Sequence, residues 1–190
     1  YGGGGFDYVS FALACEGLEA VDTFLRVVLS VHVGLNSLTL HQWATEEQKQ
    51  KWLKPQAEGT KLATFGLTEP GAGSDAGNIQ TRAVKDGDHY VLNGEKAWIS
   101  LANTADHMLV FATIDPEKKH RGLCAFMVER GMEGLTTGSF HGKLGVRAGD
   151  TGWIAFNNVR VPAENMIGEE GEGFKIAMSA IDQGRFTVAA

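Results

Sequence analysis

Residues 67–76 read LTEPGAGSDA, and the glycines and final alanine of this stretch match the G-x-G-x-x-G/A fingerprint of a dinucleotide-binding turn. A Rossmann turn needs a strand before the glycines, a helix after them and an acidic residue about 20 positions on. Residues 62–67 suit the strand, and Glu95 stands at about the required distance. The helix is missing, because residues 76–84 alternate in polarity as a strand does. Without a helix N-terminus facing a pyrophosphate, the fingerprint does not predict a nicotinamide site.

Two interpretations of the loop remain when it is taken by itself. Four polar side chains lie close together in it, namely Thr68, Glu69, Ser74 and Asp75. The glycines between them permit positive φ and a close approach of the backbone to a ligand. Glycine and proline also shape ordinary turns. From this stretch alone, a ligand-binding loop and a plain turn are equally good hypotheses.

Composition excludes several other kinds of site. The 190 residues carry 17 basic and 23 acidic side chains, a net charge of −6, with no basic stripe to bind nucleic acid. Cys15 and Cys124 stand alone, and the six histidines share no spacing, so neither a metal site nor a nucleophile–histidine pair is predicted. No continuous run of about 18 apolar residues predicts membrane insertion. Unpaired cysteines fit a reducing compartment best.

The elements around the loop fall into three groups, and the first is helical. Apolar residues recur at three- and four-residue steps over residues 8–29, and a second helix is expected over residues 31–44. Thr45 and Gln48 fit a capping box that starts a short third helix, and Pro55 marks its expected end. We therefore expect an N-terminal helical domain over residues 1–58.

The second group is a series of short strands, and the third is a helix. Asp86-Gly87 and Asn93-Gly94 are hairpin-type turn signals among these strands. Helical spacing returns from Gly173 onward. We predict an α+β chain with a middle antiparallel β-barrel or sandwich over residues 59–163 and the start of a C-terminal helical bundle over residues 164–190. The expected strands are 62–67, 79–84, 90–92, 97–100, 108–113, 123–128 and 153–156.

Four blocks of sequence carry a resemblance to a known family. They are residues 68–75 (TEPGAGSD), 93–100 (NGEKAWIS), 143–147 (KLGVR) with Thr151, and 156–162 (FNNVRVP). In order and spacing they resemble the acyl-CoA dehydrogenase family, over nearly the whole chain. That family has an N-terminal helical domain, a middle β-domain and a C-terminal helical domain, which matches the order inferred from the residues. Arg147 and Thr151 are interpreted mainly as part of the β-domain architecture.

The resemblance implies FAD as the cofactor. It places Phe65 and Leu67 along the flavin, with the Leu67 amide and the Thr68 hydroxyl directed at its N1/C2=O edge. Fixed donors at that edge would stabilise the negative charge that reduction develops there. The remaining predicted cofactor residues are Trp98 beside the ring, the neighbouring Ile99, and Ser100, whose hydroxyl would lie near N5.

The resemblance also implies an acyl-CoA thioester as substrate, bound by Ser74, Asp182 and Arg185. A glutamate would remove the α-proton while hydride leaves the β-carbon. In some family members that glutamate directly precedes the arginine at position 185, but here the residue is Gly184. The base is therefore expected beyond Ala190, in a longer protein, and this chain alone is expected to bind FAD poorly and to be inactive.

Partners and location follow from the same resemblance. It implies a role in fatty acid β-oxidation, electron transfer to an electron-transferring flavoprotein, and a homotetramer or dimer. It implies the bacterial cytoplasm or the mitochondrial matrix of a eukaryote. Two alternatives stay open, a flavin-dependent monooxygenase of the same fold and a non-catalytic binding protein of this fold. Intact Thr68 and Trp98 blocks favour the dehydrogenase.

Overall fold

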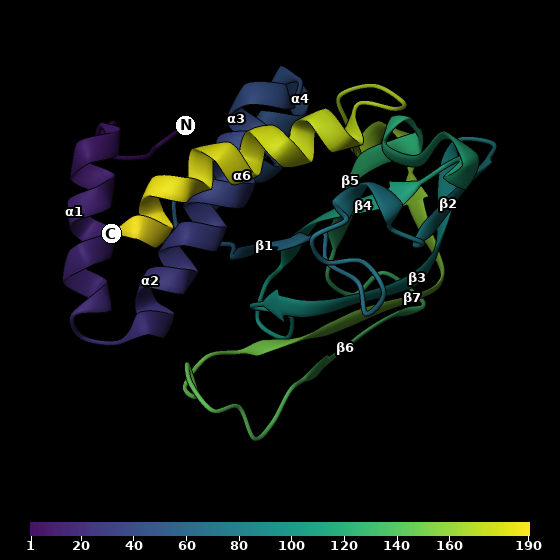
Figure 1. Cartoon of the computed structure of the whole chain (residues 1–190). Coiled ribbons are helices and arrows are strands. Elements are labelled where there is room, and N and C mark those ends of the chain that lie inside the picture. Colours follow the sequence, from purple (N-terminus) through teal and green to yellow (C-terminus); the bar gives the residue numbers. More distant parts are fainter.

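Helices gather on one side of the molecule and strands on the other, and the last helix, α6, runs across from the strands to the first helices (Figure 1). The structure is a computed structural model, and it describes all 190 residues. The order along the chain is five α-helices, a mixed sheet of eight strands, and one further α-helix. This confirms the α+β class predicted from the sequence.

The first predicted helix is divided in two. Helix α1 covers Tyr8–Glu19 and α2 covers Thr23–Leu29. The extended backbone of Asp22 interrupts the helix, and its carboxylate accepts a hydrogen bond from the Phe24 N–H at 2.7 Å. An aspartate in that conformation is a favoured N-cap, so the prediction of one helix through residue 29 was wrong.

The break expected before residue 31 is absent. Helix α2 continues without interruption through the π-helix η1 (Ser30–Ser37) into α3 (Leu38–Trp43). By length and composition alone, the stretch Thr23–Trp43 could cross a membrane. Within this stretch the buried Asn36 donates its amide to the Thr64 carbonyl at 2.7 Å, which bonds the helix to β1.

The third helical segment starts as predicted and ends later. Thr45 and Gln48 form the capping box at the start of α4 (Glu46–Gln48). The π-helix η2 (Lys49–Leu53) and α5 (Lys54–Ala57) follow directly. Pro55 was expected to end the helix, but it lies in the first turn of α5, where an α-helix does not need its missing N–H.

The sheet has the order β6-β7-β3-β2-β4-β5-β8, with β1 beside β4. Most neighbours are antiparallel, as predicted, whereas β1 and β2 each pair with β4 in parallel. Two strands, β6 and β8, were not predicted. The strands are β1 (Ala63–Gly66), β2 (Arg82–Asp86), β3 (His89–Ser100), β4 (His107–Thr113), β5 (Leu123–Glu129), β6 (Leu135–Ser139), β7 (Thr151–Pro162) and β8 (Met166–Ile167), with 3-10 turns η3 (Ala76–Asn78), η4 (Pro116–Gly122) and η5 (Ala163–Asn165).

Of the two predicted turn signals, one is a turn and the other is not. Asp86-Gly87 joins β2 to β3 as a hairpin, with Gly87 at φ +62°. Asn93-Gly94 lies inside β3, where the pairing with β7 shifts register. Gly94 has φ +146°, and a Cβ there would come within 2.7 Å of the Thr81 backbone, so the glycine makes a bulge in the strand.

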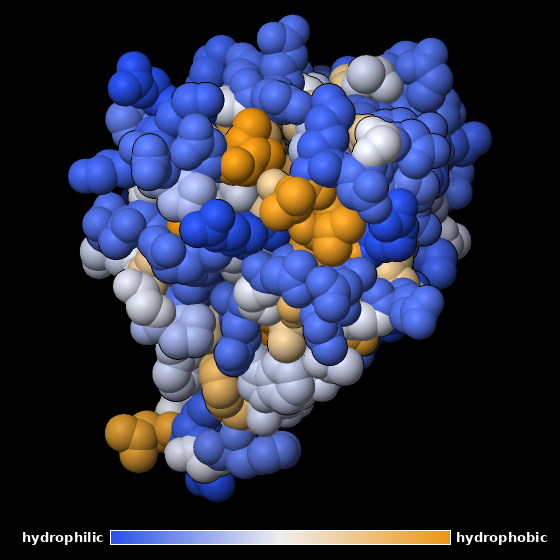
Figure 2. All heavy atoms as spheres, turned by 90° about the vertical axis from the view of Figure 1, so that its right-hand side faces the viewer, coloured by the Kyte–Doolittle hydropathy of each residue, from blue (hydrophilic) through white to orange (hydrophobic).

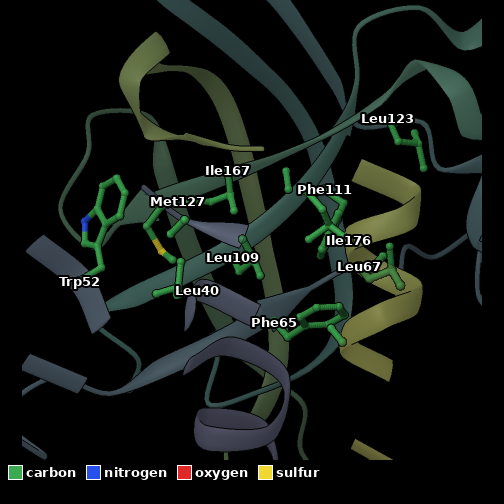
Figure 3. Packing of buried hydrophobic residues seen from close by; sticks show 14 of the residues in the cluster. Leu40, Trp52, Phe65, Leu67, Leu109, Phe111, Leu123, Met127, Ile167 and Ile176 are labelled. Carbon is green, nitrogen blue, oxygen red and sulfur yellow. The ribbon is translucent and has the colours of Figure 1, made fainter. Parts of the chain in front are cut away.

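Two hydrophobic clusters hold these layers together. One of 17 buried residues lies where the helices meet the sheet, and it includes side chains of α6 (Gly173–Ala189). Figure 3 shows members of this cluster from the helices (Leu40, Trp52), the strands (Phe65, Leu109, Met127) and α6 (Ile176). The other cluster, of 15 residues, is made by side chains of the strands and the segment after β3.

The outer surface at the strand end is mostly hydrophilic, with hydrophobic side chains only in small patches (Figure 2). Among the large apolar side chains, Phe6, Val9 and Leu13 near the N-terminus and Leu144 between β6 and β7 are more than half exposed. The site described next lies where the helices and strands meet.

Candidate functional site

A groove of about 240 Å³ opens where the end of β3 and the loop after β1 meet η1 and α6. All six residues predicted to bind the cofactor lie in its wall. The nine lining residues are Val31, Leu35, Phe65, Leu67, Thr68, Trp98, Ile99, Ser100 and Ile181. The structure thus brings together two segments that are about 30 residues apart in the sequence.

Hydrogen bonds fix these two segments to each other. The Ala97 N–H donates to the Thr68 carbonyl at 2.9 Å, which aligns the loop with β3. The Thr64 hydroxyl in β1 donates to the Ser100 carbonyl at 2.5 Å. The carbonyls of Thr68 and Ser100 each accept one of these hydrogen bonds. The backbone of the sheet therefore fixes the positions of both residues.

Trp98 faces outward because of an irregularity in β3. Its φ is +60°, and the register against β7 shifts between Ala97 and Ile99. Bulges of this kind re-aim a side chain relative to the alternation of the strand. The indole is 63% exposed, and it contacts the Phe140 ring at a centroid distance of 4.5 Å. A large aromatic surface therefore lies open at the groove.

The groove is apolar except for a few uncharged hydrogen-bonding groups. None of its nine lining side chains is ionisable at neutral pH. The hydroxyls of Thr68 and Ser100 make no hydrogen bond with other groups of the chain. Two free hydroxyls in an otherwise apolar wall can orient a polar, planar ligand.

Directly behind the loop lies a buried ion pair that the sequence did not predict. Lys96 is fully buried, and its Nζ contacts Glu69 Oε1 at 2.7 Å. Burial lowers the pKa of Lys96 to about 8, although the attraction of Glu69 opposes this. Burial acts to raise the pKa of Glu69, yet Lys96 and two backbone amides together hold that pKa below its usual value. Glu69 is therefore a structural group in the loop and does not face a ligand.

Three groove residues were missed in the sequence, namely Val31, Leu35 and Ile181. Val31 and Leu35 stand one helical turn apart, so helical spacing alone places them on one face. Ile181 falls in the helix expected from Gly173 onward, but nothing in the sequence indicated what this residue contacts. Packing of α6 against η1 decides this.

The predicted substrate residues lie outside this groove. Ser74, Asp182 and Arg185 are all exposed, and none of them lines it. Asp75, beside Ser74, lines a separate hollow of about 190 Å³ that it shares with Lys119 and His120. The structure shows no group of three or more histidine, cysteine or acidic side chains able to hold a metal ion.

Comparisons with known proteins agree along the whole chain. The family models for "Acyl-CoA dehydrogenase, N-terminal domain" and "Acyl-CoA dehydrogenase, middle domain" match residues 1–60 and 64–159. A curated relative, the short-chain specific acyl-CoA dehydrogenase of Clostridium acetobutylicum, is 46% identical over 190 residues, which are all of this chain and 50% of the relative. The chain thus spans about half the length of the curated relatives it matches.

Solved structures give the same match in three dimensions. A chain in the structure of the electron transferring flavoprotein of Acidaminococcus fermentans has a TM-score of 0.97 and 46% identity, covering all of this chain and 50% of that one. A glutaryl-CoA dehydrogenase from Mycobacterium smegmatis, in complex with FADH2, has a TM-score of 0.89 and 37% identity, covering 97% of this chain and 46% of that one.

Proposed function

The chain belongs to the acyl-CoA dehydrogenase family, and from that membership we propose that it forms the flavin-binding groove of an oxidoreductase acting on CH–CH donors. The proposed reaction is FAD-dependent oxidation of the Cα–Cβ bond of an acyl-CoA thioester to the trans-2-enoyl-CoA. The observation that carries the proposal is the groove itself, which collects all six predicted cofactor residues from segments far apart in the chain.

The chemistry of the groove suits a flavin. Thr68 and Ser100 would donate hydrogen bonds to its polar edge, and Trp98 would lie beside its ring system. When bound, FAD supplies an acceptor for the hydride that leaves the substrate. Because the wall carries no charged side chain, hydrogen-bond donors fixed in it would act in a medium of low polarity, where hydrogen bonds are strongest.

A short acyl chain is the substrate that we propose. The relative from Clostridium acetobutylicum is specific for short chains. In this chain the apolar wall formed by Val31, Leu35 and Ile181 adjoins the predicted cofactor residues. Such a wall would bind a small hydrocarbon group next to the flavin and would exclude water from it.

No base for α-proton removal lies in the groove, since none of its lining residues is a carboxylate. Position 184, where some family members carry the glutamate, is a buried glycine in α6. A Cβ on Gly184 would lie 3.0 Å from Leu35 Cδ2, so a glutamate there would require the Leu35 side chain to shift. We therefore infer that the base is not supplied by these 190 residues.

The electron acceptor and assembly are part of the same proposal. The match to a chain in an electron transferring flavoprotein structure supports a protein of that kind as the redox partner. We propose a homotetramer or dimer on family grounds, with the bacterial cytoplasm or the mitochondrial matrix as its location.

Titration of the 190-residue chain with FAD, followed by quenching of flavin fluorescence, tests the groove. We expect weak binding that becomes about 30-fold weaker in a Thr68→Val/Ser100→Ala variant, because two lost hydrogen bonds at about 1 kcal/mol each remove about 2 kcal/mol of binding free energy. The matched control is Ser10→Ala/Thr60→Val, which removes two hydroxyls on the exposed surface.

Two results would count against the proposal. One is a chain that folds but shows no flavin binding at any accessible concentration. The other is equal loss of affinity in the groove variant and in the surface control. Reduction of a dye by the isolated chain with butyryl-CoA would contradict the inference that the base lies elsewhere.

A further inference from the structure

The Lys96–Glu69 pair connects both segments that build one side of the groove. Lys96 lies two residues before Trp98 in β3, and its side chain is fully buried. Besides Glu69, its ammonium donates to the Leu67 carbonyl at 3.2 Å. One ammonium group therefore holds the loop residue that lines the groove and the carboxylate that follows it.

Glu69 extends this connection to the start of β2. Its Oε2 accepts the Gln80 N–H at 2.5 Å, and its Oε1 accepts the Thr81 N–H at 2.9 Å. Its backbone exchanges two hydrogen bonds with Ala72, which closes the turn. The carboxylate thus accepts three hydrogen bonds, and none of the three donor residues lines the groove.

Stability alone does not explain a buried ion pair at this place. Removing two charges from water is costly, and apolar residues of similar volume often replace such a pair with no loss of stability. What an apolar pair could not do is hold the Leu67 carbonyl in one orientation. That carbonyl shares its peptide plane with the Thr68 N–H, so the ammonium also orients the backbone beside the Thr68 hydroxyl.

We propose that Lys96 and Glu69 are a positioning pair for the flavin, and this rests on the function proposed above. The pair keeps the Leu67–Thr68 peptide in one orientation and keeps Thr68 at a constant distance from Ser100. It touches neither cofactor nor substrate. Its effect is to pre-organise the hydrogen-bonding wall before a ligand enters.

Amide hydrogen exchange on the FAD-free 190-residue chain tests the positioning directly. Lys96→Met alone leaves a buried carboxylate unpaired and can fail to fold, so the main variant is Glu69→Gln/Lys96→Met, which has no buried charge. We expect loss of protection confined to residues 67–72 and 96–100. The matched control is Asp86→Asn/Arg160→Met, which removes an exposed ion pair joining β2 and β7.

The second measurement is FAD affinity of the same variants. We expect Glu69→Gln/Lys96→Met to bind FAD about 10- to 100-fold more weakly, as when outer partners of binding groups are removed, with no change in the control. Unchanged exchange in the loop, or a rise that is equal over the whole sheet, would overturn the positioning role. Absence of FAD binding to the unaltered chain would refute the proposed function, while the exchange result would still decide the role of the pair.

Discussion

Mild acid should destabilise the fold through two histidines between the helices and the sheet, the buried His107 and the partly buried His32. His32 Nδ1 accepts the Ala63 N–H at 3.0 Å, and its Nε2 lies 3.2 Å from the Gln56 carbonyl, to which it can donate. His107 Nδ1 lies 3.2 Å from Gln56 Nε2, which can only donate. Both rings therefore use Nδ1 as an acceptor, and protonation there would break both hydrogen bonds.

The size of the effect follows from proton linkage. Burial lowers the pKa of both histidines from the usual 6.5. As the pH falls below 6.5, the unfolded chain binds protons that the native chain does not, so stability present above that pH is lost. For each pH unit below 6.5, each histidine lowers the free energy of unfolding by up to about 1.4 kcal/mol, and the two together lower it by up to about 3 kcal/mol.

Urea unfolding at pH values from about 7.5 to 5.5 measures this loss. The window lies above the range in which carboxylates usually titrate. In His32→Asn the amide oxygen can replace Nδ1 as acceptor without titrating, so we expect about half of the pH dependence to remain. His41→Gln, an exposed position, is the control and should keep all of it. A flat wild-type profile, or a His32→Asn profile as steep as the wild type, would refute the reasoning.

Two further predictions concern local geometry. Gly94→Ala should lower the free energy of unfolding by about 1–3 kcal/mol, because its Cβ would overlap the Thr81 backbone. The control is Gly71→Ala, whose Cβ would meet nothing within 4 Å and which should have little effect. Equal losses of stability in the two variants would contradict this account. Thr45→Ala should cost about 1 kcal/mol by removing the capping box with Gln48, measured by urea unfolding, and no loss would show that the box does not stabilise the helix.

Two local signals gave correct predictions, whereas two others, at Asp22 and Pro55, did not. The capping box at Thr45 and the hairpin at Asp86-Gly87 are present as expected, because caps and tight turns depend on a few neighbouring residues. Asn93-Gly94 has the same local signal but lies within a strand. There the deciding groups are Thr81 and β7, which are distant in the sequence.

The glycines of LTEPGAGSDA illustrate the same limit. Their spacing matched a nucleotide turn, yet neither Gly71 nor Gly73 has positive φ. The loop is instead held by Glu69, whose partner Lys96 lies 27 residues further along the chain. From the sequence alone, a carboxylate in a polar loop is interpreted as a surface group or a ligand-binding group, because its buried partner is not known.

The sequence by itself determined the order of helices and strands, the family resemblance, and six residues that share one groove. Periodicity, turn chemistry and matched blocks are properties of short segments, so they can be recognised without a structure. Only the tertiary structure decided that Val31, Leu35 and Ile181 close the groove, that Ser74, Asp182 and Arg185 lie outside it, and that an ion pair stands behind it. The first of these facts depends on how α6 and η1 pack on the sheet, and the ion pair depends on how the loop after β1 packs on β3. Packing between distant segments is not encoded in any one of them.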